Sequence, residues 1–439
     1  MPRESAGGYR EIADLGIELI QESARTGAGL HPLVAAAAGD LVRLMNCYYT
    51  NLIEGIDTRP ISIERAMQTN YAPDTEQRNL QIEARAHVEV QQLIDHGELD
   101  GIGLGEELVR RLHREFFRRM PEEMRWVVDK ETGDRAEILP GEWRTRDVKV
   151  GQGSDPGISG HIPIVSDMVP SFMRRFAEVY DGKSVSASTA AIAAAASHHR
   201  LVWIHPFIDG NGRVARLYSH AFLRRWRLGS ELWSVSRGLA RSIEGYKTHL
   251  RRADAPPQKM TDGRGTLSEG NLVDWCRYFL ETALDQARFM ARLLDTESLS
   301  RRFRLFLENE NLQPSRPRGS VMAGSMLSGS MSLASEPIDR RTIRLIDHAL
   351  LHGEVPRAIV PDLLGLTERQ ARRLVLPLEN RKIFWSSGRH APYRLQFPIA
   401  ECELLFPRLF APAEMALTAT PSGDAAEEPV PASSSGPSI

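Results

Sequence analysis

Residues 205 to 216 read HPFIDGNGRVAR, and the interpretation of the whole chain starts from this stretch. It follows an alanine-rich helical pattern, Ala187 to Trp203, and leads into a second helical segment that begins near Gly212. Pro206 disfavours helical geometry at the residue before it, so the first helix is predicted to end at His205. The imidazole of His205 is therefore expected at the entrance of a loop between two helices.

The same stretch contains the residue types of a phosphate site. Gly210 and Gly212 flank Asn211 and allow backbone amides to turn inward at a helix N-terminus, whose partial positive charge favours anions. Arg213 and Arg216 lie three apart, on one face of that helix, where guanidinium groups can bind further phosphates. The alternative is an ordinary Gly/Pro loop with a buried histidine and surface arginines, which rarely places all these functions together.

Asp209 lies among these cationic groups and is a poor phosphate contact. A carboxylate in this position suits Mg²⁺, which binds one or two carboxylates together with phosphate oxygens. Neither the Walker sequence GxxxxGK[ST] nor the HRD and DFG sequences of protein kinases occur in the chain. Nucleotide chemistry is therefore predicted on a different scaffold.

HPFIDGNGRVAR matches every defining position of the pattern HPFx[DE]GNGRxxR, so the chain resembles the Fic (Fido-fold) family. The resemblance implies a helical core that transfers AMP from ATP to a Ser, Thr or Tyr hydroxyl of a protein and releases pyrophosphate. It implies His205 as the general base, Phe207 as the anchor of the loop and Asp209 as the Mg²⁺ ligand. It assigns nucleotide and phosphate contacts to Gly210, Asn211, Gly212, Arg213 and Arg216.

The resemblance does not determine which group is transferred, because a few family members transfer UMP, phosphocholine or phosphate with nearly the same loop. The resemblance also implies a homodimer and a protein substrate with a hydroxyl side chain, the chain itself included.

A second pattern, TNLIEG at residues 50 to 55, ends an amphipathic helix predicted over 33 to 54 and resembles the family's inhibitory pattern [ST]xxxE[GN]. A carboxylate in the last helical turn faces the negative end of the helix dipole, which is unfavourable unless a cation compensates. The resemblance implies that Glu54 forms an ion pair with Arg216. An arginine paired in this way could not bind the γ-phosphate of ATP. The alternatives are an exposed glutamate beside a helix-stopping glycine, and a glutamate that positions water for the removal of AMP.

Residues 138 to 153, ILPGEWRTRDVKVGQG, interrupt the helical patterns. Pro140-Gly141 predicts a turn, and the alternation of Val148 and Val150 with charged residues predicts a short strand or hairpin. The stretch resembles the family's flap, whose edge would pair with an extended target segment by strand addition. An ordinary surface hairpin is the alternative. The residues assigned to this target-binding region are Gly141, Trp143, Arg144, Val148 and Val150.

Near the C-terminus, residues 358 to 376 predict two short helices separated by a Gly365-Leu366 turn, the second opened by a capping box from Thr367 to Gln370. With residues 383 to 395 as a wing, this looks like a winged helix-turn-helix. Residues 338 to 398 hold eleven Lys/Arg and six Asp/Glu, a balance of +5. Dimerisation or target docking ranks above DNA binding through Arg369, Arg372 and Arg373, and a DNA-binding regulator with a Fic core is the alternative function.

The composition of the chain limits the classes of protein to which it can belong. The 439 residues predict two or three domains, and 42% hydrophobic with 26% charged residues is typical of a globular chain. The longest apolar run, Ala190 to Ala196, is far shorter than a membrane span, and no apolar stretch follows the first basic residue, so a cytoplasmic protein without a membrane partner is expected. The net charge of -2 produces no field that would attract nucleic acid to the whole molecule.

The predicted fold is mainly α: a Fido-fold helical core with a short β-hairpin flap, and a winged helix-turn-helix module of mixed α and β structure. Helices are predicted over 80 to 95, 106 to 118 and 168 to 179, in addition to those named above. The predicted divisions are an N-terminal helical region with the inhibitory pattern (1–105), the catalytic core (106–312), a linker (313–337), the winged-helix module (338–400) and a disordered tail (412–439).

Overall fold

The structure is a computed structural model that describes residues 1–128, 133–150, 161–182, 185–257, 262, 265–312 and 337–411. Residues 313–336 of the predicted linker and the whole predicted tail, 412–439, lie outside the described residues.

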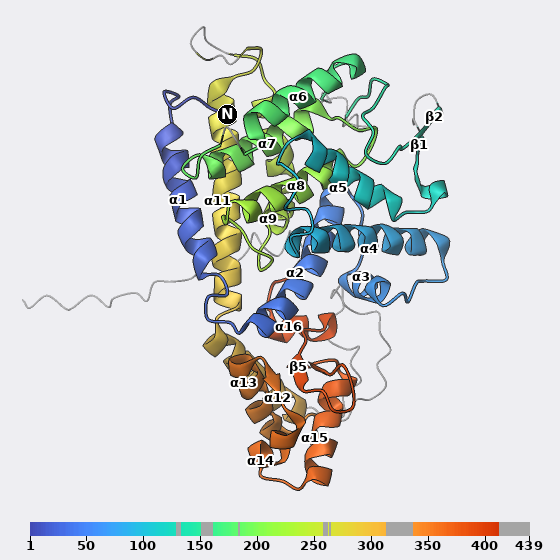
Figure 1. The fold of residues 1–439 in the computed structure, drawn as a ribbon, viewed down its shortest axis with the longest axis vertical. Coiled ribbons are helices and arrows are strands. Elements are labelled where there is room, and N and C mark those ends of the chain that lie inside the picture. The colour runs from blue at the N-terminus through green and yellow to red at the C-terminus, as the bar shows by residue number, and fades with distance from the viewer. Residues whose placement is uncertain are drawn as a thin grey trace, which may run out of the picture.

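Helices make up most of the described chain, as predicted (Figure 1). The α-helices of the main body are α1 (Tyr9–Arg25), α2 (Pro32–Ile53), α3 (Pro60–Met67), α4 (Thr75–Asp95), α5 (Glu106–Arg118), α6 (Val169–Tyr180), α7 (Ala190–Ile204), α8 (Asn211–Arg225), α9 (Val235–Arg241), α10 (Ile243–Ala253) and α11 (Glu269–Leu293). Helix α12 (Thr296–Leu312) leaves the body and packs with the later helices, which are α13 (Ile343–His352), α14 (Val360–Leu364), α15 (Glu368–Asn380) and α16 (Cys402–Leu405). Short 3₁₀ turns are η1 (Glu122–Met124), η2 (Ser166–Met168), η3 (Arg340–Thr342), η4 (Arg357–Ile359) and η5 (Ile399–Glu401).

Helix α5 has the bounds predicted for it, and α2 ends one residue before Glu54. Helix α4 begins five residues earlier than predicted, at Thr75. Its N-cap is Asp74, whose carboxylate accepts a hydrogen bond of 2.9 Å from the backbone N–H of Gln77. The first turn was missed because it is polar and carries no apolar periodicity.

The core of the body is centred on α7 and α8, which lie side by side in Figure 1. Helix α7 is almost entirely buried, and its alanines allow close approach of neighbouring helices. A Cβ at Gly16 of α1 would lie 2.9 Å from the Cβ of Ala191, so the small residues on both helices set their separation. The indole N–H of Trp275 on α11 donates to the carbonyl of Ala195 at 2.7 Å. The N-terminal helix α1 thus packs into the same body as α7 and α11.

The β-hairpin lies upstream of the stretch in which it was predicted. It consists of β1 (Trp126–Val128) and β2 (Arg135–Glu137), paired antiparallel. Within residues 138–150 the predicted turn at 140–141 is present, but no strand passes through Val148, and the strand prediction for this residue is wrong. Val150 alone forms an antiparallel bridge, with His161. Arg144 ties the segment to the 205–206 loop, as described below.

Residues 337–411, hereafter the C-terminal module, form the lower part of the molecule in Figure 1. Three short strands, β3 (Glu354–Val355), β4 (Phe384–Trp385) and β5 (Tyr393–Leu395), make an antiparallel sheet of order β3-β5-β4. Helix α14 ends at Gly365, which has the left-handed φ of 65°. Helix α15 begins after Thr367, whose side chain and that of Gln370 form the predicted capping box.

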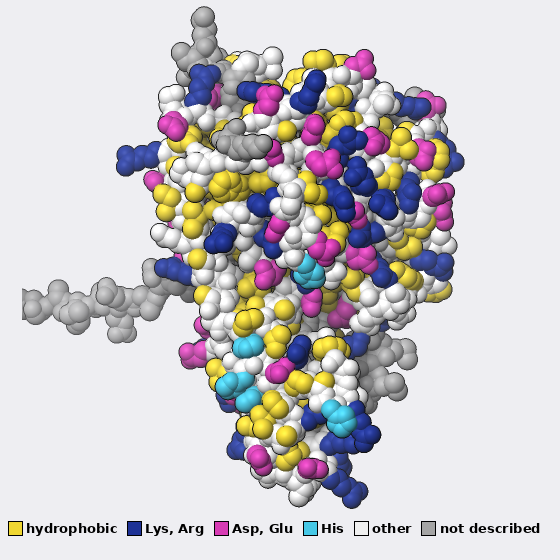
Figure 2. Space-filling view, viewed as in Figure 1, with side chains coloured by type: hydrophobic (Ala, Val, Ile, Leu, Met, Phe, Trp, Pro, Cys, Tyr) yellow, Lys and Arg dark blue, Asp and Glu magenta, His cyan; other side chains and the backbone are white. Residues whose placement is uncertain are grey.

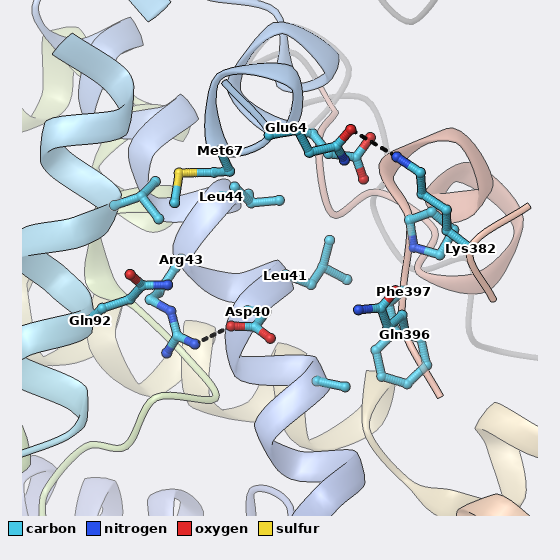
Figure 3. Close-up of a pocket in the computed structure, with 14 residues that line it drawn as sticks. Asp40, Leu41, Arg43, Leu44, Glu64, Met67, Gln92, Lys382, Gln396 and Phe397 are labelled. Atoms are coloured by element: carbon cyan, nitrogen blue, oxygen red, sulfur yellow. Dashed lines mark hydrogen bonds and ion pairs between the residues drawn. The ribbon is translucent and has the colours of Figure 1, made fainter. Parts of the chain in front are cut away.

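The C-terminal module and the main body meet at α2 and α3, beside a cavity of about 220 Å³ (Figure 3). Leu41, Leu44 and Met67 from the body face Phe397 and Lys382 of the module across it. Charged side chains of both signs are interspersed over the visible face of the body (Figure 2). No helix among the described residues combines the length and apolar character that crossing a membrane requires.

Four buried histidines make stability depend on pH. Burial lowers the pKa of His87, His113, His198 and His205 to about 3 each. These side chains are neutral in the folded protein and become protonated in the unfolded chain below about pH 6.5. One pH unit below that value, each costs about 1.4 kcal/mol of stability. His161, whose raised pKa acts in the opposite direction, offsets part of this loss.

We expect the urea midpoint of unfolding to fall as the pH is lowered from 7 to 5. His87→Leu should reduce this dependence by about a quarter, since one of four such histidines is removed. His96→Gln, at an exposed histidine, should leave it unchanged. A midpoint that stays constant or rises toward pH 5 would contradict the assignment.

Candidate active site

The loop that joins α7 to α8 holds His205 in an unusual backbone conformation. Helix α7 ends at Ile204, as the proline at 206 predicted, and His205 has φ 52° and ψ 62°. A non-glycine residue in the left-handed region costs about 1–3 kcal/mol and persists only where its surroundings impose it.

Arg144 is one of those surroundings. It is buried, with 4% exposure, and its Nε donates to the carbonyl of His205 at 2.7 Å. Its backbone N–H donates to the carbonyl of Pro206 at 2.9 Å. Arg144 therefore fixes the segment 141–150 against the loop that carries the histidine. The neighbouring Trp143 packs on Phe207, with ring centroids 5.0 Å apart.

Asn211 holds the other end of the loop. Its side-chain oxygen accepts from the N–H of Phe207 and its side-chain amide donates to the carbonyl of Phe207, both at 2.9 Å. The Phe207 ring is buried and stacks on His113 at a centroid distance of 3.8 Å. The Asn211 side chain is thus committed to the loop, and only its backbone N–H is left to bind an anion.

Two glycines shape the N-terminus of α8, hereafter the anion nest (backbone of residues 210–213). Gly210 has φ 77°, and a Cβ there would lie 2.7 Å from the Phe117 ring, so neither the conformation nor the space admits a side chain. A Cβ at Gly212 would collide with the carboxylate of Glu54. The nest is therefore in direct contact with a negatively charged group that comes from α2.

Glu54 and Arg216 form an ion pair at this contact. Glu54 is the C-cap of α2, and its Oε1 accepts from Nη2 of Arg216. Arg216 is 2% exposed, and its Nε donates to the hydroxyl of Thr50 at 2.5 Å. The first and fifth residues of the TNLIEG pattern thus bind the same guanidinium group.

Electrostatics keep Glu54 ionised. Burial by itself would raise the pKa of Glu54, but the charges of Arg216 and Arg213 outweigh it, so the pKa lies below its usual value. The carboxylate is also close to the positive end of the α8 dipole.

Arg213 is turned toward α4. Its guanidinium pairs with Glu83, lies 5.1 Å from the centroid of the Phe116 ring, and has Nη2 at 3.5 Å from Oδ2 of Asp209. The Asp209 side chain is 45% exposed. A phosphate contact by Arg213 would thus compete with Glu83, whereas Asp209 is accessible to a ligand.

His205 is neutral because of its surroundings. Burial, followed by the positive charges of His161 and Arg144, lowers the pKa of His205 to about 3. Its Nδ1 has no hydrogen-bond partner among the described residues. His161 lies with Nδ1 at 3.2 Å from Asp254 and Nε2 at 2.9 Å from the carbonyl of Trp203. Asp254 outweighs the effect of burial and raises the pKa of His161.

The fold brings together the residues that the sequence placed in two separate patterns. Loop 205–216, Glu54 and the segment from Gly141 to Arg144 meet at one end of α8. Val150 pairs with His161 instead, and among the described residues neither Val148 nor Val150 forms a hydrogen bond with the nest. Sequence reasoning missed Glu83, His161 and Asp254. No local pattern marks these three residues, because each is more than 40 positions from the group it contacts.

The comparisons with known proteins bear on the same region. Residues 103–223 match the model of the Fic/DOC family. The protein adenylyltransferases Fic of Drosophila erecta and Drosophila ananassae are each 29% identical to this chain over 147 residues, 33% of it. The chain thereby spans 28% and 27% of the length of these two relatives.

The similarity in fold covers more of the chain than the family match does. The crystal structure of a Fic family protein from Desulfovibrio desulfuricans G20 has a TM-score of 0.50 and 16% sequence identity, and the match covers 90% of this chain and 98% of that one. The family match identifies residues 103–223 as a Fic/DOC family domain, and the structural match shows a shared, mostly helical fold.

Proposed function

We propose that this protein transfers AMP from ATP to a hydroxyl group of a protein and that Glu54 inhibits the transfer. The observation that carries the proposal is the meeting of a neutral His205, the anion nest and the buried Arg216 at one end of α8. The names of the Drosophila relatives, protein adenylyltransferase Fic, support the same chemistry.

The nest and Arg216 would bind the triphosphate. The N–H groups of the first turn of α8 have no partners within the helix and point toward an anion placed there. Arg216 can bind the γ-phosphate once Glu54 has left it, because a guanidinium group binds phosphate oxygens in the same geometry as a carboxylate. The α-phosphorus would then be presented toward His205.

His205 would act as the general base. It would accept the proton of the target hydroxyl while the hydroxyl oxygen forms a bond to the α-phosphorus. The bond between the α-phosphorus and the bridging oxygen breaks, and pyrophosphate leaves with that oxygen. A neutral imidazole is the form this step requires, and the low pKa of His205 provides it at neutral pH.

Asp209 is suited to Mg²⁺ bound together with the nucleotide. Its carboxylate is 45% exposed at the mouth of the nest, and no group of three or more His, Cys, Asp or Glu side chains among the described residues could hold a metal alone. One carboxylate plus phosphate oxygens and water is the donor set that Mg²⁺ prefers. When bound, the ion would neutralise phosphate charge.

The segment 141–150 would receive the target. Arg144 fixes its start beside His205, and Thr145, Arg146 and Asp147 are exposed. An extended target strand could pair with this segment through main-chain hydrogen bonds. The hydroxyl would then be positioned by the backbone, whatever the neighbouring side chains.

Glu54 would hold the enzyme inactive by occupying the contacts that the nucleotide needs. A charge-assisted ion pair of this kind contributes about 1.5–3 kcal/mol. We therefore expect Glu54→Gly to raise the rate of AMP transfer about tenfold to a hundredfold. Intact mass spectrometry after incubation with ATP and Mg²⁺ measures the rate and identifies the added group.

Asp57→Gly is the matched control, because it removes an exposed carboxylate three residues along the chain. Equal labelling of the wild type, Glu54→Gly and Asp57→Gly would refute the inhibitory role. An added mass other than that of AMP would refute the donor assignment.

His205→Ala, introduced into the Glu54→Gly background, should reduce transfer by about 10²–10⁴-fold, because the proton acceptor is lost. ATP binding, measured by calorimetry, should persist in this variant, since the nest and Arg216 remain. Undiminished transfer would show that His205 is not the base.

Asp209→Asn in the same background should raise the Mg²⁺ concentration needed for half-maximal transfer, because the only charged protein ligand proposed for the ion is removed. The measurement is a Mg²⁺ titration at saturating ATP. Asp14→Asn, at an exposed carboxylate on α1, is the control. An unchanged titration curve for Asp209→Asn would argue against metal binding at this residue.

A further inference from the structure

The C-terminal module carries a basic groove that the proposed enzyme chemistry does not use. The groove encloses about 900 Å³ between α14, α15 and the loop that joins β4 to β5. Arg369, Arg372 and Arg373 line it from α15, and Arg389 and His390 line it from the loop. Figure 2 shows the corresponding cluster of Lys and Arg side chains at the lower right of the molecule.

The arginines of this groove are available to a ligand. Arg369, Arg372, Arg373 and Arg389 are exposed and form no ion pair or hydrogen bond within the part of the chain that the structure describes. Other arginines of the module are committed to carboxylates of the fold: Arg357 to Glu379, Arg381 to Glu401 and Arg394 to Glu354. Glu368 and Glu379 also line the groove, and Glu379 is the partner of Arg357.

The arrangement of helices gives these charges a definite geometry. Helix α15 follows α14 after the short turn 365–367 and packs on the module through the buried Ala371, Val375 and Leu378, of which Ala371 and Val375 form the floor of the groove. Positions 369, 372 and 373 are spaced i, i+3 and i+4, so their side chains share the outward face of the helix. The face is at the end of the module remote from α7 and α8 (Figure 1).

We propose that the C-terminal module is a winged helix-turn-helix that binds duplex DNA, with α15 in the major groove and Arg389 on the adjacent phosphate backbone. The major groove admits an α-helix, and the second helix of such a pair is the one that enters it. The short sheet places the loop with Arg389 beside α15, so cations on two elements can contact phosphates on both sides of the helix.

Other occupants fit these observations less well. A second copy of the module would bring the same four arginines against one another, so charge repulsion opposes self-association through this face. The major groove of A-form RNA is too deep and narrow for a helix. The DNA proposal extends beyond AMP transfer and does not depend on it, because neither ATP nor the target protein takes part.

The test is a fluorescence anisotropy titration of the full-length protein with a labelled DNA duplex of two helical turns, about 20 bp. We expect wild-type binding at about 50 mM salt that weakens steeply toward 200 mM, as counterion release requires. R369E/R372E/R373E should weaken binding at least about tenfold and reduce the slope of log K against log salt by about 2–3.

R10E/R174E/R292E is the matched control. It produces the same change in net charge at three exposed arginines of the main body, so it should leave the affinity within about twofold of wild type. Circular dichroism checks that both triple variants are folded. If the charge reversal in R369E/R372E/R373E disturbs the fold of the module, the variant R372Q/R373Q is used in its place. We expect it to lose less DNA affinity than the triple variant.

The absence of wild-type binding at low salt would overturn the proposal and leave an acidic protein surface as the occupant. An equal loss of affinity in both triple variants would overturn the assignment of the groove. Equal binding of an RNA duplex of the same sequence would overturn the placement of α15 in a major groove. The proposal is supported if only R369E/R372E/R373E loses affinity for the DNA duplex and if the wild type binds the RNA duplex more weakly than the DNA duplex.

Discussion

The burial of Arg216 is the constraint on which the arrangement of this molecule depends. Arg216 is 2% exposed, and a buried charge without partners would cost several kcal/mol. Glu54 and Thr50 satisfy it, and both lie at the end of α2. Arg216 therefore docks the C-terminal end of one helix on the N-terminal end of another. The same contact places a carboxylate on the anion nest, so the group that stabilises the buried arginine is also the one that the proposed inhibition requires.

Helix α2 connects this contact to the C-terminal module. The hydroxyl of Tyr49, in the turn before Glu54, is 3.0 Å from the carbonyl oxygens of both Leu409 and Ala411, although it can donate to only one at a time. The adjacent Tyr48 packs on Phe410 with ring centroids 5.9 Å apart. Helix α2 is thus held at the candidate site and at the C-terminal module together. The release of Glu54 that the proposed function requires would have to be accommodated by these contacts as well as by Arg216.

The sequence predicted the parts of the fold whose cause is local. Helix α5 could be bounded because its apolar spacing is regular, and α7 ends where Pro206 requires it. The segment 138–150 was misjudged at Val148, because alternation of apolar and charged residues is also compatible with an extended chain tied to another loop. That tie is made by the side chain of Arg144 to His205, 61 residues away, and nothing near either residue indicates it.

By itself, the sequence determined the chemical inventory of the site: a histidine before a proline, two glycines at a helix start, an aspartate, two arginines and a distant glutamate. All but the glutamate follow from residue type and spacing within one or two turns of chain, and the glutamate was assigned to the site by the family resemblance. The tertiary structure alone decided that Asn211 braces the loop, that Arg213 pairs with Glu83, and that His161 adds positive charge beside His205. Such contacts join segments far apart in sequence, and they are fixed by how the helices pack, for which no short stretch of sequence carries a signal.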